Sequence, residues 1–190
     1  MGPVRKAVIV GGGTAGWLAA SVLGRSMGSR LEIELIESDA IGTVGVGEAT
    51  IPPIRLPLAM LGIDENEFLS RTQGTIKLGI QFNDWARRGD SYIHAFGPTG
   101  HPLGMLEFYH YWLRRQAQGF TDDLASFSLN ASSALANKYG RVDNAAPGSP
   151  ASLVHAFHFD AALVAQYLRT LSEKLSIRRT EGKVVDTVLR

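Results

Sequence analysis

The feature that most constrains the fold is a run of glycines between an apolar segment and a helical pattern near the N-terminus. Residues 4–10 are mainly apolar, as in a parallel strand buried on both faces. Residues 11–16, Gly-Gly-Gly-Thr-Ala-Gly, satisfy the pattern G-x-G-x-x-G. Residues 17–27 then carry apolar side chains at helical spacing, and residues 31–36 predict a second strand that ends at Glu37. This order predicts a strand–helix–strand unit of an α/β fold.

The glycines of this loop have separate expected roles. Gly11 permits the tight turn, Gly13 lets the backbone approach a pyrophosphate, and Gly16 lets helix and strand pack closely. The helix N-terminus offers free N–H groups to the anion. Glu37 follows Gly16 by about 20 residues, where a carboxylate accepts hydrogen bonds from a ribose and disfavours the 2′-phosphate of NADP. The pattern predicts a dinucleotide site; the alternative is a plain glycine turn followed by a surface glutamate.

Composition restricts the class of protein further. The chain has 190 residues, which is too short for two full-sized domains, and its net charge of +1 gives no field for nucleic acid or lipid headgroups. It has no cysteine, so disulfides, thiolate zinc sites and cysteine nucleophiles are excluded. No stretch reaches the roughly 20 apolar residues of a membrane span. We expect a cytoplasmic α/β protein with no metal site and no nucleic-acid or membrane partner.

The rest of the chain predicts both strands and helices. Asp64 and Glu67 predict a helix N-terminus. Residues 75–82 alternate as one strand, with Lys77 on the polar face among small neighbours that leave its ammonium accessible. Residues 92–96 form another predicted strand, in which His94 and Phe96 share a face. Further predictions are helices over 106–118 and 159–175, short helical pieces within 121–152, and a strand over 183–190.

A second glycine segment, Gly-Val-Gly-Glu-Ala-Thr-Ile-Pro at 45–52, is unusual for an NAD-binding domain. A flavin has a use for it, because its pyrophosphate and ring system run past a second stretch of backbone. Together with Gly-Gly-Gly-Thr-Ala-Gly-Trp at 11–17, the segment around Lys77, His-Ala-Phe-Gly at 94–97 and residues 155–165, it resembles the tryptophan halogenase family of flavin-dependent halogenases. The resemblance covers nearly the whole chain and is loosest over residues 97–154.

The resemblance implies a Rossmann-like FAD-binding domain of the flavin monooxygenase type, incomplete at the C-terminus. Residues 1–190 are expected to be the N-terminal part of a halogenase, with 1–96 and 155–190 as the FAD-binding portion and 97–154 as a substrate-side excursion. The family's Trp-x-Trp-x-Ile-Pro segment is absent from this sequence. Its later glutamate and its halide-binding loop are expected beyond residue 190, and this part alone is expected to be inactive.

The resemblance implies site roles for the residues of this chain that match the family's motifs. The residues expected to contact FAD are Gly12, Thr14, Ala15, Glu37, Ile41, Glu48, Ala49 and Val184. Those expected to face the aromatic substrate are Pro52, His94 and Phe96. Lys77 occupies the position of the essential lysine.

The family chemistry implied is halogenation of an electron-rich aromatic such as tryptophan or another indole. A separate NAD(P)H-dependent flavin reductase supplies FADH2, which reacts with O2 and chloride or bromide to give hypohalous acid. Lys77 delivers it, either as an ammonium that donates a hydrogen bond or as a neutral amine that forms a haloamine. Two alternatives remain: a flavin-dependent aromatic monooxygenase that reduces its own flavin, and a non-catalytic FAD-binding module.

Overall fold

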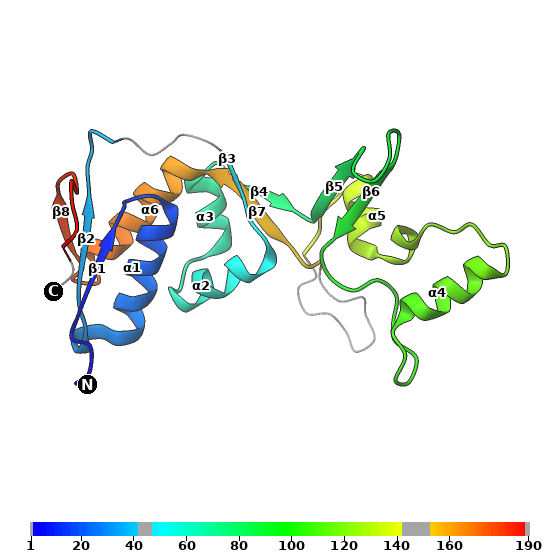
Figure 1. Ribbon diagram of the computed structural model, residues 1–190, viewed down its shortest axis with the longest axis horizontal. Coiled ribbons are helices and arrows are strands. Elements are labelled where there is room, and N and C mark those ends of the chain that lie inside the picture. The colour runs from blue at the N-terminus through cyan, green and yellow to red at the C-terminus, as the bar shows by residue number, and fades with distance from the viewer. Residues whose placement is uncertain (1, 42–46, 142–152, 189–190) are drawn as a thin grey trace. The chain divides into compact units, whose positions relative to one another are not determined.

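The computed structural model describes residues 2–41, 47–141 and 153–188 (Figure 1). The chain divides into a first unit, Met1–Thr75 with Phe157–Arg190, and a second unit, Ile76–Ala156. The second unit contains β5 (Gly79–Asn83) and β6 (Ser91–Ala95), which form an antiparallel hairpin with each other. The expected division into an FAD-binding portion and a substrate-side excursion stays a prediction.

The first unit is built on a parallel sheet in the order β1–β2–β8. Its strands are β1 (Lys6–Val10), β2 (Glu32–Glu37) and β8 (Arg178–Glu181). Helix α1 (Thr14–Met27) and the turn η1 (Gly28–Arg30) connect β1 to β2, which confirms the predicted strand–helix–strand unit. Helix α6 (Ala161–Glu173) precedes β8 and lies beside α1 on the same side of the sheet (Figure 1).

Small residues let α1 pack closely against α6 and the segment after it. The buried residues of α1 are spaced for a single helical face: Trp17, Ala20, Ser21 and Gly24. The Ser21 and Ser172 hydroxyls hydrogen bond at 2.7 Å. A Cβ on Gly24 would lie 3.0 Å from Ile177. Beneath the helices, Ile33 and Leu35 of β2 are buried in the core.

The opposite face of this sheet is open in the described residues and carries both apolar and charged side chains. Strand β1 begins at Lys6, and Val8 and Val10 are 50% and 64% exposed, so the prediction of a strand buried on both faces is wrong here. Glu34 is held on this face by Lys6 at 3.0 Å, by the Thr180 hydroxyl at 2.7 Å and by Arg178. The hydrogen bond from Thr180, followed by those from Lys6 and Arg178, lowers the pKa of Glu34 to about 2.

A second sheet, in the order β3–β7–β4, joins segments far apart in sequence. Its strands are β3 (Gly47–Ala49), β7 (Ala156–Asp160) and β4 (Thr75–Lys77). The Thr50 hydroxyl donates to the carbonyl of Phe157 and accepts from its N–H, which fastens the end of β3 to β7. The turn η2 (Pro52–Ile54) and helices α2 (Arg55–Met60) and α3 (Glu65–Arg71) follow. Residues 45 and 46 of the second glycine segment lie outside the described residues.

Several predicted boundaries are confirmed and others are corrected. The Asp64 carboxylate accepts from the N–H groups of Asn66 and Glu67, which confirms the predicted helix start. The helix predicted over 159–175 begins only at Ala161, because residues 159–160 complete β7. The strand predicted over 183–190 is wrong for its described part: the strand is β8, and residues 182–188 have no regular secondary structure.

The second unit combines the β5–β6 hairpin with short helices. These are α4 (Phe108–Ala117), η3 (Leu124–Phe127) and α5 (Leu129–Leu135), which confirm the predicted helix and the short helical pieces. The last part of that predicted region, residues 142–152, is outside the described residues. Among the helices that the structure describes, none has the length and apolar character needed to cross a membrane.

Candidate functional site

A pocket of about 580 Å³ opens in the first unit, where β1 and β2 end. Three regions of the chain line it beside the glycine loop: the end of β2, the second glycine segment and the residues after β8. The lining residues are Val10, Gly11, Gly12, Gly13, Thr14, Ile36, Glu37, Ser38, Asp39, Ile41, Glu48, Gly182, Lys183 and Val184. Six of the eight residues expected to contact FAD are therefore brought together here.

The glycine loop has the geometry that its three expected roles require. Gly11 adopts φ +109°, which side chains rarely tolerate. A Cβ on Gly16 would overlap the carbonyl oxygen of Gly11, so only glycine lets α1 approach the turn this closely. A Cβ on Gly13 would meet nothing within 4 Å and would project into open space. Gly13 also provides no side-chain cap to α1, so the first N–H groups of the helix are available to an anion.

Glu37 closes one side of this pocket from the end of β2. Its side chain is 14% exposed and is held by two donors. Arg179 Nε donates to Oε1 at 2.6 Å, and Trp17 Nε1 donates to Oε2 at 3.3 Å. The hydrogen bond to Glu37 is the largest cause that raises the pKa of Arg179 above its usual range. Sequence reasoning missed Arg179, because only the β2–β8 register places it beside Glu37.

The second glycine segment reaches the same pocket through β3. Glu48 pairs with Phe159 of β7, and this register leaves Glu48 among the lining residues. Ala15 and Ala49 are exposed and are not among the lining residues. Val184 does line the pocket, although it follows β8 instead of lying in a strand. The structure thus brings Glu48 of the second glycine segment to the pocket beside the first glycine loop.

In the second unit, Lys77 lies beside Phe96. Lys77 is 8% exposed, and its Nζ lies 5.6 Å from the centroid of the Phe96 ring. The expectation of an accessible lysine on a continuous polar face is wrong, because the predicted strand breaks at Leu78 into β4 and β5. The N–H of Phe96 donates to the carbonyl of Leu78 at 2.8 Å, which brings the Phe96 ring next to Lys77.

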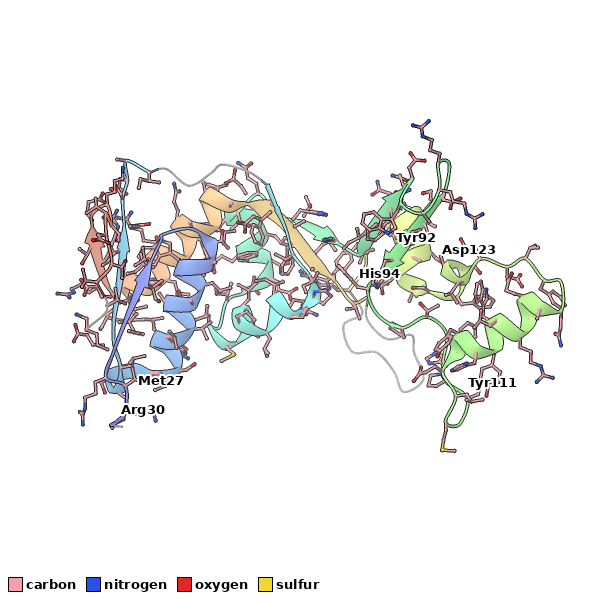
Figure 2. The ribbon with its side chains drawn as sticks, in the orientation of Figure 1. Met27, Arg30, Tyr92, His94, Tyr111 and Asp123 are labelled. Atoms are coloured by element: carbon pink, nitrogen blue, oxygen red, sulfur yellow. The ribbon has the colours of Figure 1, made fainter. Side chains whose placement is uncertain are left out.

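His94 lines a different pocket of the second unit, of about 310 Å³, between β6 and the η3–α5 segment. Figure 2 labels Tyr92, His94 and Asp123, which contribute to its wall. Phe96 directly follows β6, which ends at Ala95, and it is not among the lining residues of this pocket. Pro52 is half-buried at the start of η2 in the first unit and lines neither pocket.

A family model described as tryptophan halogenase matches residues 6–190. The chain belongs to the tryptophan halogenase family. Tryptophan 7-halogenase RebH from Lentzea aerocolonigenes is 34% identical over 197 aligned residues, which cover 96% of this chain and 37% of the relative.

Solved structures of flavin-dependent halogenases share the fold. Xcc4156 from Xanthomonas campestris superposes with a TM-score of 0.87 at 42% identity, and BrvH from Brevundimonas sp. BAL3 with 0.82 at 38%. The matches cover 96% and 98% of this chain, and 36% and 37% of those chains. The chain therefore has the Rossmann-like FAD-binding α/β fold of this halogenase family, and it spans just over a third of the relatives' length.

One histidine of this member of the halogenase family, His155, is buried among hydrogen-bonding partners. His155 is 4% exposed, and its Nδ1 lies 3.1 Å from the carbonyl oxygen of Leu153 and 3.4 Å from the Tyr139 hydroxyl. Within residues 2–41, 47–141 and 153–188, no three His, Asp or Glu side chains gather closely enough to hold a metal ion.

Proposed function

We propose that the protein is a flavin-dependent halogenase that uses reduced FAD, O2 and chloride or bromide to halogenate an electron-rich aromatic such as tryptophan or another indole. The observation that carries the proposal is the convergence of both glycine segments and Glu37 on one pocket. Membership of the tryptophan halogenase family supports the same chemistry. A separate NAD(P)H-dependent flavin reductase is the expected source of the reduced cofactor.

The pocket fits the adenosine diphosphate half of FAD. The first-turn N–H groups of α1, including that of Ala15, are suited to the pyrophosphate, and the open space at Gly13 leaves room for it. Glu37 accepts hydrogen bonds from the ribose. Backbone and side chains around the rim hold the rest of the cofactor. These rim residues are Gly12, Thr14, Ile41, Glu48 and Val184. When bound, reduced FAD supplies the activation of O2 by which the halide is oxidised.

Lys77 carries the oxidised halogen to the substrate in this proposal. Lys77 is largely buried, and a reactive, unselective species such as hypohalous acid needs protection from bulk water to reach one ring carbon. An ammonium can hold hypohalous acid by a hydrogen bond, whereas a neutral amine can form a haloamine with release of water. The neighbouring Phe96 ring offers a flat surface for an aromatic substrate. His94 and Pro52 remain weaker candidates for substrate contact, because neither lies beside Lys77 in a described contact.

Product analysis by mass spectrometry of the full-length protein tests the proposal. The reaction contains FAD, a flavin reductase, NADH, bromide and a panel of indoles, phenols and pyrroles. Lys77→Ala is expected to keep FAD binding and flavin oxidation while losing halogenated product. Lys77→Arg is also expected to fail, because a guanidinium cannot readily form the haloamine or match its geometry. Lys138→Ala, at an exposed lysine of the same unit, is the matched control and keeps the product.

Three outcomes would contradict the proposal in different ways. Halogenation by Lys77→Ala at near wild-type rate removes Lys77 from the chemistry. Rapid NADH oxidation by the purified protein without a reductase favours the aromatic monooxygenase. Stoichiometric FAD binding without turnover of any aromatic favours the non-catalytic module.

A further inference from the structure

Each oxygen of the Glu37 carboxylate accepts a hydrogen bond, and the two donors belong to different elements of the fold. Arg179 reaches Oε1 from β8, and Trp17 reaches Oε2 from the first turn of α1. The Trp17 side chain is fully buried, with 2% of the residue exposed. Gly12 completes the arrangement, because a Cβ at that position would overlap the carboxylate. The carboxylate therefore lies directly against the glycine loop.

These two contacts restrict the motion of Glu37, a carboxylate of the pocket that can accept hydrogen bonds from ribose hydroxyls. A glutamate side chain has three rotatable bonds, and ordering such a side chain costs conformational entropy. A carboxylate has about four lone-pair sites. Trp17 and Arg179 occupy one site on each oxygen, so the carboxylate plane is set before a ligand arrives and other sites remain for hydroxyl groups. Preorganisation of this kind raises affinity by lowering the ordering cost of binding.

Arg179 also balances the negative charge that gathers at the end of β2. Its guanidinium lies 2.6 Å from Asp39 and 2.6 Å from Glu181, in addition to its contact with Glu37. Arg169 of α6 adds a weaker contact, at 3.7 Å from Glu37 Oε1. A planar guanidinium can hold several carboxylates in fixed directions, which a lysine ammonium does less well. Glu37 is thus held in a fixed orientation by two arginines although its side chain is mostly covered.

We propose that Trp17 and Arg179 are positioning residues that orient the Glu37 carboxylate toward the 2′-hydroxyl of the cofactor's adenosine ribose. The inference rests on the proposed FAD site and deepens it. Trp17 belongs to the Gly-Gly-Gly-Thr-Ala-Gly-Trp motif, and its indole N–H gives this last residue of the motif a role in ligand binding. Both residues act through Glu37 and need no contact with the cofactor themselves.

The test compares the affinity of the full-length protein for ADP and 2′-deoxy-ADP by calorimetry. The wild-type protein is expected to prefer ADP by about tenfold, as one hydrogen bond to a charged group provides. Trp17→Phe removes the donor but keeps an aromatic ring, and it is expected to reduce the preference to about threefold or less. Arg179→Lys, on another element, is expected to reduce it as well. Trp112→Phe, which removes an indole N–H bonded to the Asp122 carbonyl at 2.8 Å, is the matched control and keeps the full preference.

The ratio of two affinities separates positioning from general damage, because a loosened fold weakens both nucleotides alike. Full retention of the ADP preference in both Trp17→Phe and Arg179→Lys overturns the inference while leaving the FAD site standing. A wild-type protein that binds FAD but does not distinguish ADP from 2′-deoxy-ADP also overturns it. Failure of the wild-type protein to bind FAD at all refutes the proposed function itself.

Discussion

Replacing Gly13 and Gly16 by alanine should separate ligand binding from folding within one loop. At Gly16 the new Cβ overlaps the carbonyl oxygen of Gly11 and lies 3.1 Å from the carbonyl carbon. Gly11 is held at φ +109°, so this carbonyl moves only if the turn or α1 moves. At Gly13 the new Cβ meets nothing within 4 Å, and φ −75° with ψ −178° suits alanine.

The expected cost for Gly16→Ala follows from two opposing effects. Forcing a methyl group against packed backbone costs up to about 3 kcal/mol. The better helix propensity of alanine returns at most about 1 kcal/mol. The net loss of about 2 kcal/mol in the free energy of unfolding corresponds to a Tm lower by roughly 4–8 °C for a chain of this size. Gly13→Ala exchanges one N-cap residue for a poorer one and should cost no more than about 1 kcal/mol.

FAD affinity should fall more in Gly13→Ala than in Gly16→Ala, which is the reverse of their expected effects on stability. The methyl group of Gly13→Ala projects into the space where the backbone approaches the pyrophosphate, so the Kd for FAD should rise at least about tenfold. Urea unfolding followed by circular dichroism, without flavin, measures stability, and titration of FAD fluorescence measures binding. An unchanged urea midpoint for Gly16→Ala would refute the packing argument. Wild-type FAD affinity in Gly13→Ala would refute the assignment of the pyrophosphate site.

Two further predictions concern the sheet and α6. Because the pKa of Glu34 is lowered to about 2, from 4.5 without its partners, its stabilising effect is complete above about pH 5 and is lost as the pH falls toward 2. The urea midpoint of Glu34→Gln should therefore fall less steeply between pH 5 and pH 3 than that of the wild-type protein, and parallel curves would contradict this. Asp160→Ala removes the cap on the N–H of Leu163 and should cost about 1 kcal/mol, whereas Asp160→Asn should keep most of it in the same unfolding assay; equal loss in both variants argues against the cap.

Local rules were enough to predict the β1–α1–β2 unit, the start of α3 and a ligand site beside the glycine loop. A glycine that must adopt positive φ, a helix that must start beside it and a carboxylate at the end of the next strand depend on neighbours in sequence. The same holds for the Asp64 cap, whose two hydrogen bonds span only three residues. The motifs around Gly11 and Glu48 also carried the family resemblance, which the family model bears out.

Contacts between distant segments could not be predicted in this way. Arg179 meets Glu37 only through the β2–β8 register, and Glu48 reaches the pocket only because β3 pairs with β7. Lys77 is buried at the end of β4, and the strand is interrupted at Leu78, although the alternating pattern continues through that residue without a sign of the break. Side-chain periodicity records which residues share a face of a strand but not which partner covers that face. The pairing of distant strands determines that partner, and therefore the charged neighbours, burial and orientation of each residue in the site.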